Sequence, residues 1–414
     1  MSNLLSVEEV QKRILGAFQP LPMELVPLRQ ACGRVLGEDL VAGFALPPFD
    51  NSSVDGFALK ASDRTSEPNQ EVILKVIGDI PAGVLPQFEL QSGQAARIMT
   101  GAPLPPGADC VVPVEETDFP YRDPNAGLPE TVRVVRFPSV GDNIRSHGQD
   151  VQAGAVLLKS GHILHPQDTG MVSTLGHATV LVHRKPRIGL FSSGDELLAP
   201  GEPLQPGKIY DANSYTLSDL AMREGAQMIY LGVASDQEEQ IREKFIQAVQ
   251  AGVDLILTSA GVSVGAFDYV RRILEENGAL ELWRVNMRPG KPLAFGSFQN
   301  TPVISLPGNP VSAFIGFLVF IRPAIKKLSG ILHWQPREVL AVTEETIHSD
   351  GRESYLRAVL TANPSGFTAR LTGHQGSGNL FSLVLANALL IVPAGVKSIP
   401  AGTVVKTWML DTTC

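Results

Sequence analysis

The stretch Val253-Asp254-Leu255-Ile256-Leu257-Thr258 runs into the small-residue loop Ala260-Gly261-Val262-Ser263-Val264-Gly265. The apolar run predicts a buried strand, and Asp268 then begins a helix. Two more strands lead into the loops Arg288-Pro289-Gly290-Lys291-Pro292 and Leu306-Pro307-Gly308-Asn309-Pro310. Open α/β sheets hold ligands at such strand ends, because glycine lets backbone N–H groups approach an anion. An acid and two cations on neighbouring loops predict a metal-assisted site for a phosphorylated or oxyanionic ligand.

Strand and helix patterns alternate from residue 183 to residue 329, which predicts a mainly parallel sheet with helices on both faces. Ser6 and Glu9 form a capping box at the start of a helix over 6–18. Residues 47–56 are too rich in turn formers for regular structure, and the strands expected over 70–137 form a small β domain. Beyond Gly330 the helical period vanishes, which predicts a terminal β barrel or sandwich.

Length and charge limit the function classes. A chain of 414 residues is too long for one ordinary core, so two to four domains are expected. Lysine and arginine total 34 and aspartate and glutamate total 42, so the formal charge is −8. This balance argues against a general nucleic-acid surface, which needs a dense basic patch. It still allows a small anionic substrate where cations gather locally.

The cysteines and the apolar segments indicate a compartment. Cys32, Cys110 and Cys414 lie far apart without CxxC spacing, so neither a disulfide framework nor a zinc knuckle is expected. The amino terminus lacks the basic and long apolar regions of a secretory signal. The most apolar run, 311–321, is about half of the roughly 20 residues that a membrane span needs. We therefore expect a cytoplasmic protein that does not bind membranes.

A hydrolase is one reading of the first loop. The string 261–265 matches the GxSxG pattern of a nucleophile elbow, with Ser263 as the nucleophile. Such an enzyme needs a later acid and histidine, but His333, His348 and His374 lie in the expected β segment beyond the sheet. No His-Gly-Gly loop precedes the serine. A ligand-binding loop is favoured, and a purely structural turn stays as a third reading.

Acidic residues follow other strand ends. Asp268 at a helix start is either a plain N-cap or a ligand, and the loop 191–196 carries Asp195 and Glu196. Carboxylates on neighbouring loops can bind magnesium, which takes one or two of them together with substrate phosphates. Asp236, with Glu239 three positions later, is interpreted first as a helix cap.

Basic and amide groups occupy the remaining loops. Arg288 and Lys291 flank a Pro-Gly turn and suit an anion, since arginine forks to oxyanions and lysine acts as a point charge. A solvated turn is the alternative. Asn309 and Pro310 resemble an N-cap and first position of a helix over 310–329, whose free N–H groups either face an anion or need only capping.

Two histidine-containing patterns carry less weight. His162 and His165 form an HxxH pattern in an extended stretch, where positions i and i+3 point to opposite faces, so a shared metal is not expected. The glycine-rich string 372–379 lies between late strands and suggests a phosphate nest, although alone it is a weak signal.

Taken together, the motifs resemble those of the molybdopterin molybdenumtransferases, the MoeA family that includes the gephyrin E domain. The resemblance covers nearly the whole chain. The matching strings are Pro48-Phe49-Asp50-Asn51-Ser52, Asp55-Gly56-Phe57-Ala58, Arg97-Ile98-Met99-Thr100-Gly101-Ala102-Pro103, Gly148-Gln149-Asp150, Ser193-Gly194-Asp195-Glu196-Leu197, Thr258-Ser259-Ala260-Gly261-Val262-Ser263-Val264-Gly265, Arg288-Pro289-Gly290-Lys291-Pro292, Leu306-Pro307-Gly308-Asn309-Pro310 and His374-Gln375-Gly376-Ser377-Gly378.

The resemblance implies a reaction and partners. Molybdate is inserted into adenylylated molybdopterin with Mg2+, releasing AMP and molybdenum cofactor. The family implies a homodimer whose cleft draws on both subunits, and a molybdopterin adenylyltransferase as substrate donor. Molybdoenzymes or their chaperones are further partners that it allows.

The resemblance also implies a multidomain α/β architecture. It comprises an elongated mixed domain at 1–48 and 142–182, an inserted β-rich domain at 49–141, a molybdopterin-binding α/β domain at 183–329 and a C-terminal β-barrel-like domain at 330–414.

Site residues carry over by motif position. The implied catalytic set is Asp55, Glu196, Asp268 and Lys291, with Glu196 and Asp268 as metal ligands. The implied substrate-binding set is Thr100, Asp150, Asp236, Gly261, Ser263, Gly265, Arg288, Arg352 and Ser377.

Three residues depart from the family pattern: Phe57 replaces a tyrosine, Ala260 a glycine and Ser193 a threonine. Alanine at 260 would strain a backbone of positive φ.

Other readings stay open at this point. A gephyrin-like scaffold that keeps the fold and anchors partners is one, and a different nucleotide-handling enzyme on the same α/β domain is another. Molybdate and tungstate have nearly the same size and charge, so the sequence does not separate them. Nor does it identify the residues that contact the metal oxyanion.

Overall fold

The computed structural model describes residues 4–65, 71–120, 127–260 and 266–410. The chain forms two compact units, one holding residues 1–38, 160–170 and 178–414 and the other residues 39–159 and 171–177. Within the described ranges, no helix has both the length and the apolar character that crossing a bilayer requires.

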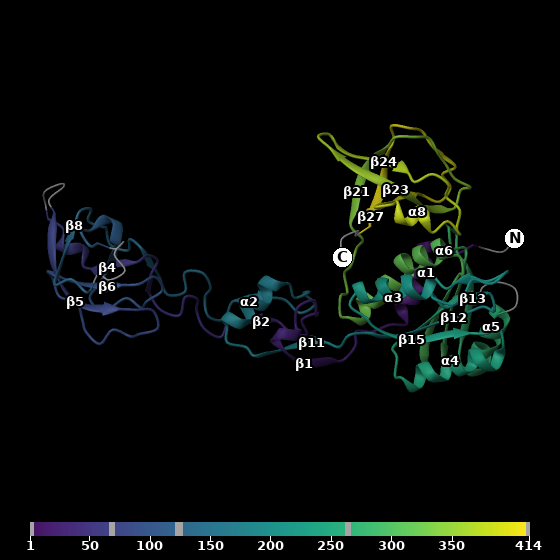
Figure 1. Cartoon of the computed structure of the whole chain (residues 1–414), viewed down its shortest axis with the longest axis horizontal. Helices are drawn as coiled ribbons and strands as arrows, with labels where there is room; N and C mark the ends of the chain where they lie inside the picture. Colours follow the sequence, from purple (N-terminus) through teal and green to yellow (C-terminus); the bar gives the residue numbers. More distant parts are fainter. Residues whose placement is uncertain (1–3, 66–70, 121–126, 261–265, 411–414) are drawn as a thin grey trace. The chain divides into compact units, whose positions relative to one another are not determined.

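A six-stranded sheet forms the centre of the first unit (Figure 1). Its strand order is β15-β12-β16-β20-β19-β17. The strands are β12 (Arg187–Ser193), β15 (Gln227–Ala234), β16 (Leu255–Ala260), β17 (Leu280–Arg284), β19 (Pro292–Phe298) and β20 (Thr301–Leu306). The strands β15, β12, β16 and β20 pair in parallel. The strand β19 pairs antiparallel with β20, and β17 pairs antiparallel with β19. The prediction of a mainly parallel sheet is confirmed, and parallel pairing brings the carboxyl ends of β12, β16 and β20 to one edge.

Helices cover both faces of this sheet. Alternate residues of a strand point to opposite faces, so Leu255 and Leu257 of β16 join one core and Ile256 joins the other. The first core also contains residues of α1 (Val7–Gly16), α3 (Asn213–Arg223), α6 (Pro310–Gly316) and α7 (Arg322–Leu328). The second contains residues of α4 (Glu238–Gln250) and α5 (Ala266–Asn277).

The helix expected over 310–329 is interrupted. Residues Phe317–Ile321 (η4) form a π-helical stretch between α6 and α7. Pro323 has no N–H and cannot donate to the carbonyl oxygen of Val319 four residues earlier. That oxygen instead accepts a 2.8 Å hydrogen bond from Gln11 Nε2. A proline inside a buried helix therefore explains the local change of hydrogen-bonding pattern.

The first unit also contains a closed five-stranded barrel, because β23 pairs with both β24 and β25. Its strands are β21 (Glu338–Thr343), β23 (Glu353–Asn363), β24 (Gly366–Leu371), β25 (Ala388–Val392) and β27 (Val404–Met409). The strand β18 (Met287–Arg288) pairs with the start of β23, and Tyr355 and Leu389 join the core of the α/β sheet. The predicted terminal barrel is confirmed, and it packs directly on the sheet.

Smaller elements complete the first unit. They are the paired strands β1 (Met23–Pro27) and β11 (Thr179–His183), β13 (Leu197–Leu198) and β14 (Ile209–Tyr210), β22 (Ile347–His348) and β26 (Ser398–Ile399), the helix α8 (Phe381–Val384) and the 3-10 turn η1 (Leu28–Gln30). The helix α2 (Pro166–Thr174) crosses the sequence boundary between the two units.

The second unit is built on a five-stranded sheet of order β7-β4-β6-β5-β8. Its strands are β4 (Gly56–Leu59), β5 (Val72–Ile80), β6 (Gln94–Ile98), β7 (Cys110–Pro113) and β8 (Thr131–Val134). Phe57 and Ala58 point to different faces, and each face has its own apolar core. The remaining elements are β2 (Leu40–Val41), β3 (Asn51–Ser52), β9 (Ile144–Arg145), β10 (Val156–Leu158), η2 (Ala61–Asp63) and η3 (Val114–Glu116).

Three local predictions were wrong. The segment 47–56, expected to be irregular, contains β3 and the start of β4 because both segments find pairing partners. Asp236 does not cap α4, whose N-cap is Gln237 without a side-chain hydrogen bond. The rings of His162 and His165 do not point apart; their centroids lie 5.8 Å apart, because the chain turns into α2 directly after His165. The division into four domains stays a prediction.

Candidate functional site

A pocket of about 620 Å³ opens at the carboxyl edge of the six-stranded sheet. Ser192 and Glu196 reach it from the end of β12, Ser259 from β16 and Gly308 from the loop after β20. The pocket therefore lies at the strand ends that were expected to hold a ligand.

Asn213, at the start of α3, ties two of these elements together. Its Nδ2 donates to Ser259 Oγ at 2.6 Å and to the carbonyl oxygen of Gly308 at 2.8 Å. The Ser259 side chain is almost fully buried, so the bond also satisfies an oxygen that would otherwise lack water. The sequence reasoning missed Asn213; its only signal was an Asp-Ala-Asn-Ser string at the start of a helix.

A buried polar network of Asp211, Ser214 and Ser192 lies next to Asn213 at the start of α3. Asp211 accepts hydrogen bonds from Ser214 N at 3.1 Å and Ser214 Oγ at 2.5 Å, which satisfies donors at the start of α3. Ser214 Oγ also lies 2.9 Å from Ser192 Oγ. These contacts join β12 to α3 and fix the side of the pocket that Asn213 forms.

Glu196 is held at the pocket by its own loop. A Cβ on Gly194, where φ is +154°, would lie only 2.5 Å from Glu196 Oε2. The carboxylate thus folds back over a glycine that has no side chain to displace it. Glu196, which the sequence predicts as a site residue, lines the pocket.

Two further acids lie beside Glu196. Asp195 Oδ1 accepts a hydrogen bond from Asp236 N at 3.1 Å. Burial raises the pKa of Asp236 above its ordinary value, and the charges of Asp195 and Glu196 add to the shift. Asp236 Oδ1 is buried and has no hydrogen-bond partner among the described residues. The carboxylates of Asp195, Glu196 and Asp236 therefore lie close together, and a bound cation would reduce the repulsion between them.

Cations gather at the adjoining turn. Arg352 donates to Asp350 Oδ2 from Nη2 at 2.5 Å and to the carbonyl oxygen of Met287 at 3.1 Å. Arg288 Nη1 lies 3.9 Å from the same carboxylate, and the hydrogen bond from Arg352, with the charges of both arginines, holds the pKa of Asp350 below its ordinary value. Lys291 is exposed and makes no ion pair with any residue that the structure describes. The Asp350 carboxylate therefore faces two arginines, and Lys291 on the same turn has no anionic partner among the described residues.

The turn and the 374–378 string both reach the pocket. Pro292, next to Lys291, and Gly378, next to Ser377, line it. A Cβ on Gly290, where φ is +99°, would lie 3.5 Å from the carbonyl oxygen of Ser312, another lining residue. Val311 N donates to Ser377 O at 3.1 Å. The first unit thus brings together Glu196, Arg288, Lys291, Arg352 and Ser377 from four separate segments.

Three predicted residues lie in the second unit. Asp55 Oδ1 accepts hydrogen bonds from Thr100 N and Thr100 Oγ1, both at 2.7 Å, and these bonds lower the pKa of Asp55. Asp150 pairs with Arg145 Nη2 at 2.5 Å. The two motifs that contain Asp55 and Thr100 thus meet within this unit.

Part of the prediction lies outside the described residues. Gly261, Ser263 and Gly265 belong to the loop 261–265, and the backbone of Asp268 is in α5 whereas its side chain is not described. Among the residues that are described, no group of three or more His, Cys, Asp or Glu side chains is arranged to hold a metal ion. A magnesium ion here would need substrate oxygens to complete its ligands, which is its usual habit.

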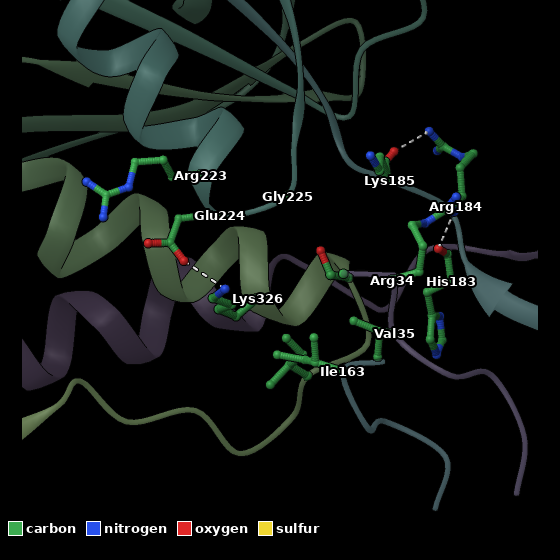
Figure 2. Close-up of a pocket in the computed structure, with 13 residues that line it drawn as sticks. Arg34, Val35, Ile163, His183, Arg184, Lys185, Arg223, Glu224, Gly225 and Lys326 are labelled. Atoms are coloured by element: carbon green, nitrogen blue, oxygen red, sulfur yellow. Dashed lines mark hydrogen bonds and ion pairs between the residues drawn. The ribbon is translucent and has the colours of Figure 1, made fainter. Parts of the chain in front are cut away.

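A second pocket of about 190 Å³ has several basic side chains in its lining (Figure 2). Its ionic residues are Arg34, Arg184, Lys185, Arg223, Glu224 and Lys326. Several of its cations already have anionic partners. Arg34 contacts the Glu24 carboxylate, Arg184 pairs with Asp254 at 2.7 Å, and Lys326 pairs with Glu224 at 2.7 Å. We interpret this pocket as a structural junction, because its charges are largely neutralised within the fold.

Comparison with protein families matches three successive regions. Residues 5–176 match the MoeA N-terminal region (domain I and II), residues 189–327 match a probable molybdopterin binding domain, and residues 341–410 match the MoeA C-terminal region (domain IV).

Full-length relatives are similar throughout. A protein of Mycobacterium tuberculosis named molybdopterin molybdenumtransferase 2 is 37% identical over 98% of this chain and 99% of its own length. A molybdopterin molybdenumtransferase of Nostoc sp. is 38% identical over 92% of this chain and 87% of its own. A crystal structure of a molybdopterin biosynthesis MoeA protein from Pyrococcus horikosii superposes with a TM-score of 0.82 at 30% identity, covering 98% of this chain and 99% of that one.

Proposed function

The chain belongs to the MoeA family of molybdopterin molybdenumtransferases, and we propose that the pocket around Asn213 and Glu196 is where it inserts molybdenum into molybdopterin. The chain is accordingly an enzyme of molybdenum cofactor biosynthesis. The observation that carries the location is the convergence of one acid, three cations and a glycine-rich loop at the sheet edge.

We infer that the pterin substrate is adenylylated and that AMP is released. A pterin phosphate joined to AMP is anionic and molybdate is a dianion, so the two reactants repel each other. Arg288 and Arg352 share a single carboxylate, that of Asp350, and Lys291 pairs with no described acid, so the charge of these three residues is only partly neutralised. Fixed cations that face developing negative charge need no reorganisation during the reaction, which is an effective form of catalysis.

Magnesium is the proposed cofactor, with Glu196 and Asp268 as its ligands. Support comes from the donor set, because Asp195, Glu196 and Asp236 offer only carboxylate oxygens, which suit a hard cation. The unpartnered Asp236 Oδ1 is a further candidate ligand. When bound, the ion supplies positive charge that polarises a phosphoryl oxygen.

The chain's own residues orient the reactants. An oxygen of water or of molybdate attacks the adenylyl phosphorus, the phosphoanhydride bond breaks, and its electron pair leaves on the pterin phosphate oxygen. The two dithiolene sulfurs displace two oxygens from molybdate. These oxygens leave as water, or one of them leaves as part of AMP where molybdate was the attacking group. Arg288 and Lys291 hold the oxyanion, while Asn213, Ser259 and the 306–310 loop shape the pterin side. Holding both reactants in place lowers the barrier by removing their translational freedom.

Asp55, Thr100 and Asp150 are proposed to act on the same substrate across a homodimer. Support is chemical: Thr100 keeps the Asp55 carboxylate ionised and oriented. Ile209 and Tyr210 line the pocket yet are 57% and 41% exposed, so a partner subunit would find apolar surface to cover. A molybdopterin adenylyltransferase is the proposed donor, and molybdoenzymes or their chaperones are proposed recipients.

The experiment combines purified protein with adenylylated molybdopterin, Mg2+ and sodium molybdate, and measures AMP and reconstituted molybdoenzyme activity. We expect AMP release that requires both salts and falls at least tenfold in Lys291→Met, since one fixed charge is lost at the oxyanion. Lys185→Met, in the second pocket, is the matched control and keeps wild-type turnover. A folded wild type without AMP release would instead support the scaffold reading. Replacing molybdate with tungstate measures the metal preference.

A further inference from the structure

Among the residues that the structure describes, Arg357 on β23 is the largest side chain that is completely buried, with 0% exposure. Its Nε donates to Ser382 Oγ at 3.0 Å and its Nη2 to the carbonyl oxygen of Gly376 at 3.0 Å. Its Nη1 is buried without a hydrogen-bond partner, and no carboxylate among the described residues pairs with it. A buried arginine normally has an anionic partner, because an isolated charge is costly in a low-dielectric interior.

The charge of Arg357 persists at neutral pH. Burial lowers the pKa of Arg357 to about 10, and the positive charge of Arg288 adds to the shift. The guanidinium is therefore still protonated at pH 7. Because the fold does not neutralise this buried cation, the binding of an anion near it would be favourable.

Arg357 also holds the 372–379 loop at its backbone. Arg357 N donates to Gln375 Oε1 at 2.9 Å, and the Arg357 carbonyl oxygen accepts from Thr372 N at 3.0 Å and from Gln375 Nε2 at 3.1 Å. Ser382 Oγ, which receives the Arg357 Nε hydrogen bond, donates in turn to Asn379 O at 2.6 Å. One residue thus anchors both ends and the middle of the loop.

The anchored loop presents free donors beside the pocket. Gly376 O and Ser377 N belong to the same peptide group, so a cation bonded to that oxygen polarises the N–H. Neither Ser377 N–H, Gly378 N–H nor the Ser377 hydroxyl donates to another described residue. Gly378 lines the pocket at the sheet edge.

We propose that Arg357 is a positioning residue of the transferase site: from within the barrel it holds and polarises the Ser377–Gly378 segment so that its N–H groups receive a tetrahedral oxyanion. The inference rests on the proposed function and names molybdate as the oxyanion. Arg357 acts through Gly376 and does not itself need to touch the substrate.

The test compares Arg357→Lys, Arg357→Met and Ser377→Ala in the molybdate-dependent AMP-release assay. Lysine keeps the charge but cannot reach both Ser382 and Gly376 in a fork. We expect the KM for molybdate to rise about tenfold in Arg357→Lys and about 100-fold in Arg357→Met, with smaller changes in kcat. Ser377→Ala removes only the hydroxyl and leaves both N–H groups. Combining it with Arg357→Met should raise KM by less than the product of the two single increases, because the hydroxyl belongs to the segment that Arg357 holds in place.

Arg34→Met is the control for general damage. Arg34 is also buried, but it pairs with Glu24 in the second pocket. This variant should melt at a lower temperature and keep the wild-type KM for molybdate. If Arg357→Met does not fold, the test uses Arg357→Lys. The increase in melting temperature that sodium molybdate causes is then measured, with sodium sulfate for comparison.

Two failures are distinguishable. If wild type releases no AMP in response to molybdate, the proposed function fails and the role of Arg357 fails with it. If wild type and Lys291→Met behave as proposed but the Arg357 variants keep the wild-type KM, or add fully to Ser377→Ala, then Arg357 only supports the barrel and the inference is overturned.

Discussion

Gly194→Ala should reduce activity by moving one carboxylate. The added Cβ would lie 2.5 Å from Glu196 Oε2, whereas an ordinary contact needs about 3.4 Å. The Glu196 side chain is flexible and would move away by roughly 0.9 Å. Displacing a reacting group by about 1 Å can cost about 100-fold in rate. We therefore expect AMP release to fall about 100-fold.

The backbone makes a second, separable contribution. At φ +154° an alanine is strained by about 1–3 kcal/mol. Gly201→Ala is the matched control, because its φ is +97° and nothing lies within 4 Å of an added Cβ. Both variants should lose stability by similar amounts, whereas only Gly194→Ala should lose AMP release and need more Mg2+ for half-maximal rate.

AMP release by both variants is measured over a magnesium titration, together with their thermal unfolding. Wild-type activity in both alanine variants would refute the reasoning, since it would mean that the position of Glu196 does not matter. Equal loss of activity in both would assign the effect to loop strain.

Two further predictions concern other acids. Asp55→Asn keeps an oxygen that can accept both Thr100 hydrogen bonds, so the melting temperature should stay within about 2 °C while AMP release falls about 100-fold; a fully active variant would reduce Asp55 to a support for Thr100. In the folded state the pKa of Asp236 is raised above its ordinary value of 3.8, so the folded state binds this proton more tightly than the unfolded state does. Wild-type stability therefore falls as the pH rises from about 4 through the raised pKa. Asp236→Asn should therefore melt about 1–2 °C above wild type at pH 7 and equally with it below pH 3.8, in thermal scans without magnesium; a lower melting temperature at pH 7 would contradict this sign.

Much of the architecture could be predicted because its signals are local. The apolar run at 253–258 and the alternation of strand and helix from 183 to 329 identify buried parallel strands. The change of period after Gly330 marks the barrel. The loop 306–310 follows β20, which pairs in parallel with β16, so its arrival at the carboxyl edge was predictable from the direction of parallel pairing. The loop 288–292 lies between β17 and β19, and it reaches the same edge through their antiparallel pairing.

The local failures share one cause. Asp236 has the sequence pattern of a cap, yet α4 begins after it and its backbone N–H bonds to Asp195 on another strand end. The HxxH spacing was interpreted with an extended geometry that the chain abandons at α2. In each case a contact distant in sequence, or a turn, overrode the pattern of a few neighbouring residues.

By itself the amino-acid sequence determined the order of the elements, the family and the kinds of side chain at the strand ends, because these depend on short-range periodicity and on motifs read in line. Only the tertiary structure decided that Asn213 joins Ser259 to Gly308 and that Asp350 faces two arginines. It also decided that Arg357 lies buried, bonded to Gly376 O and paired with no acid in the described part of the chain. Such contacts join residues up to about 100 positions apart, and they form only where sheet order and barrel closure place the chain.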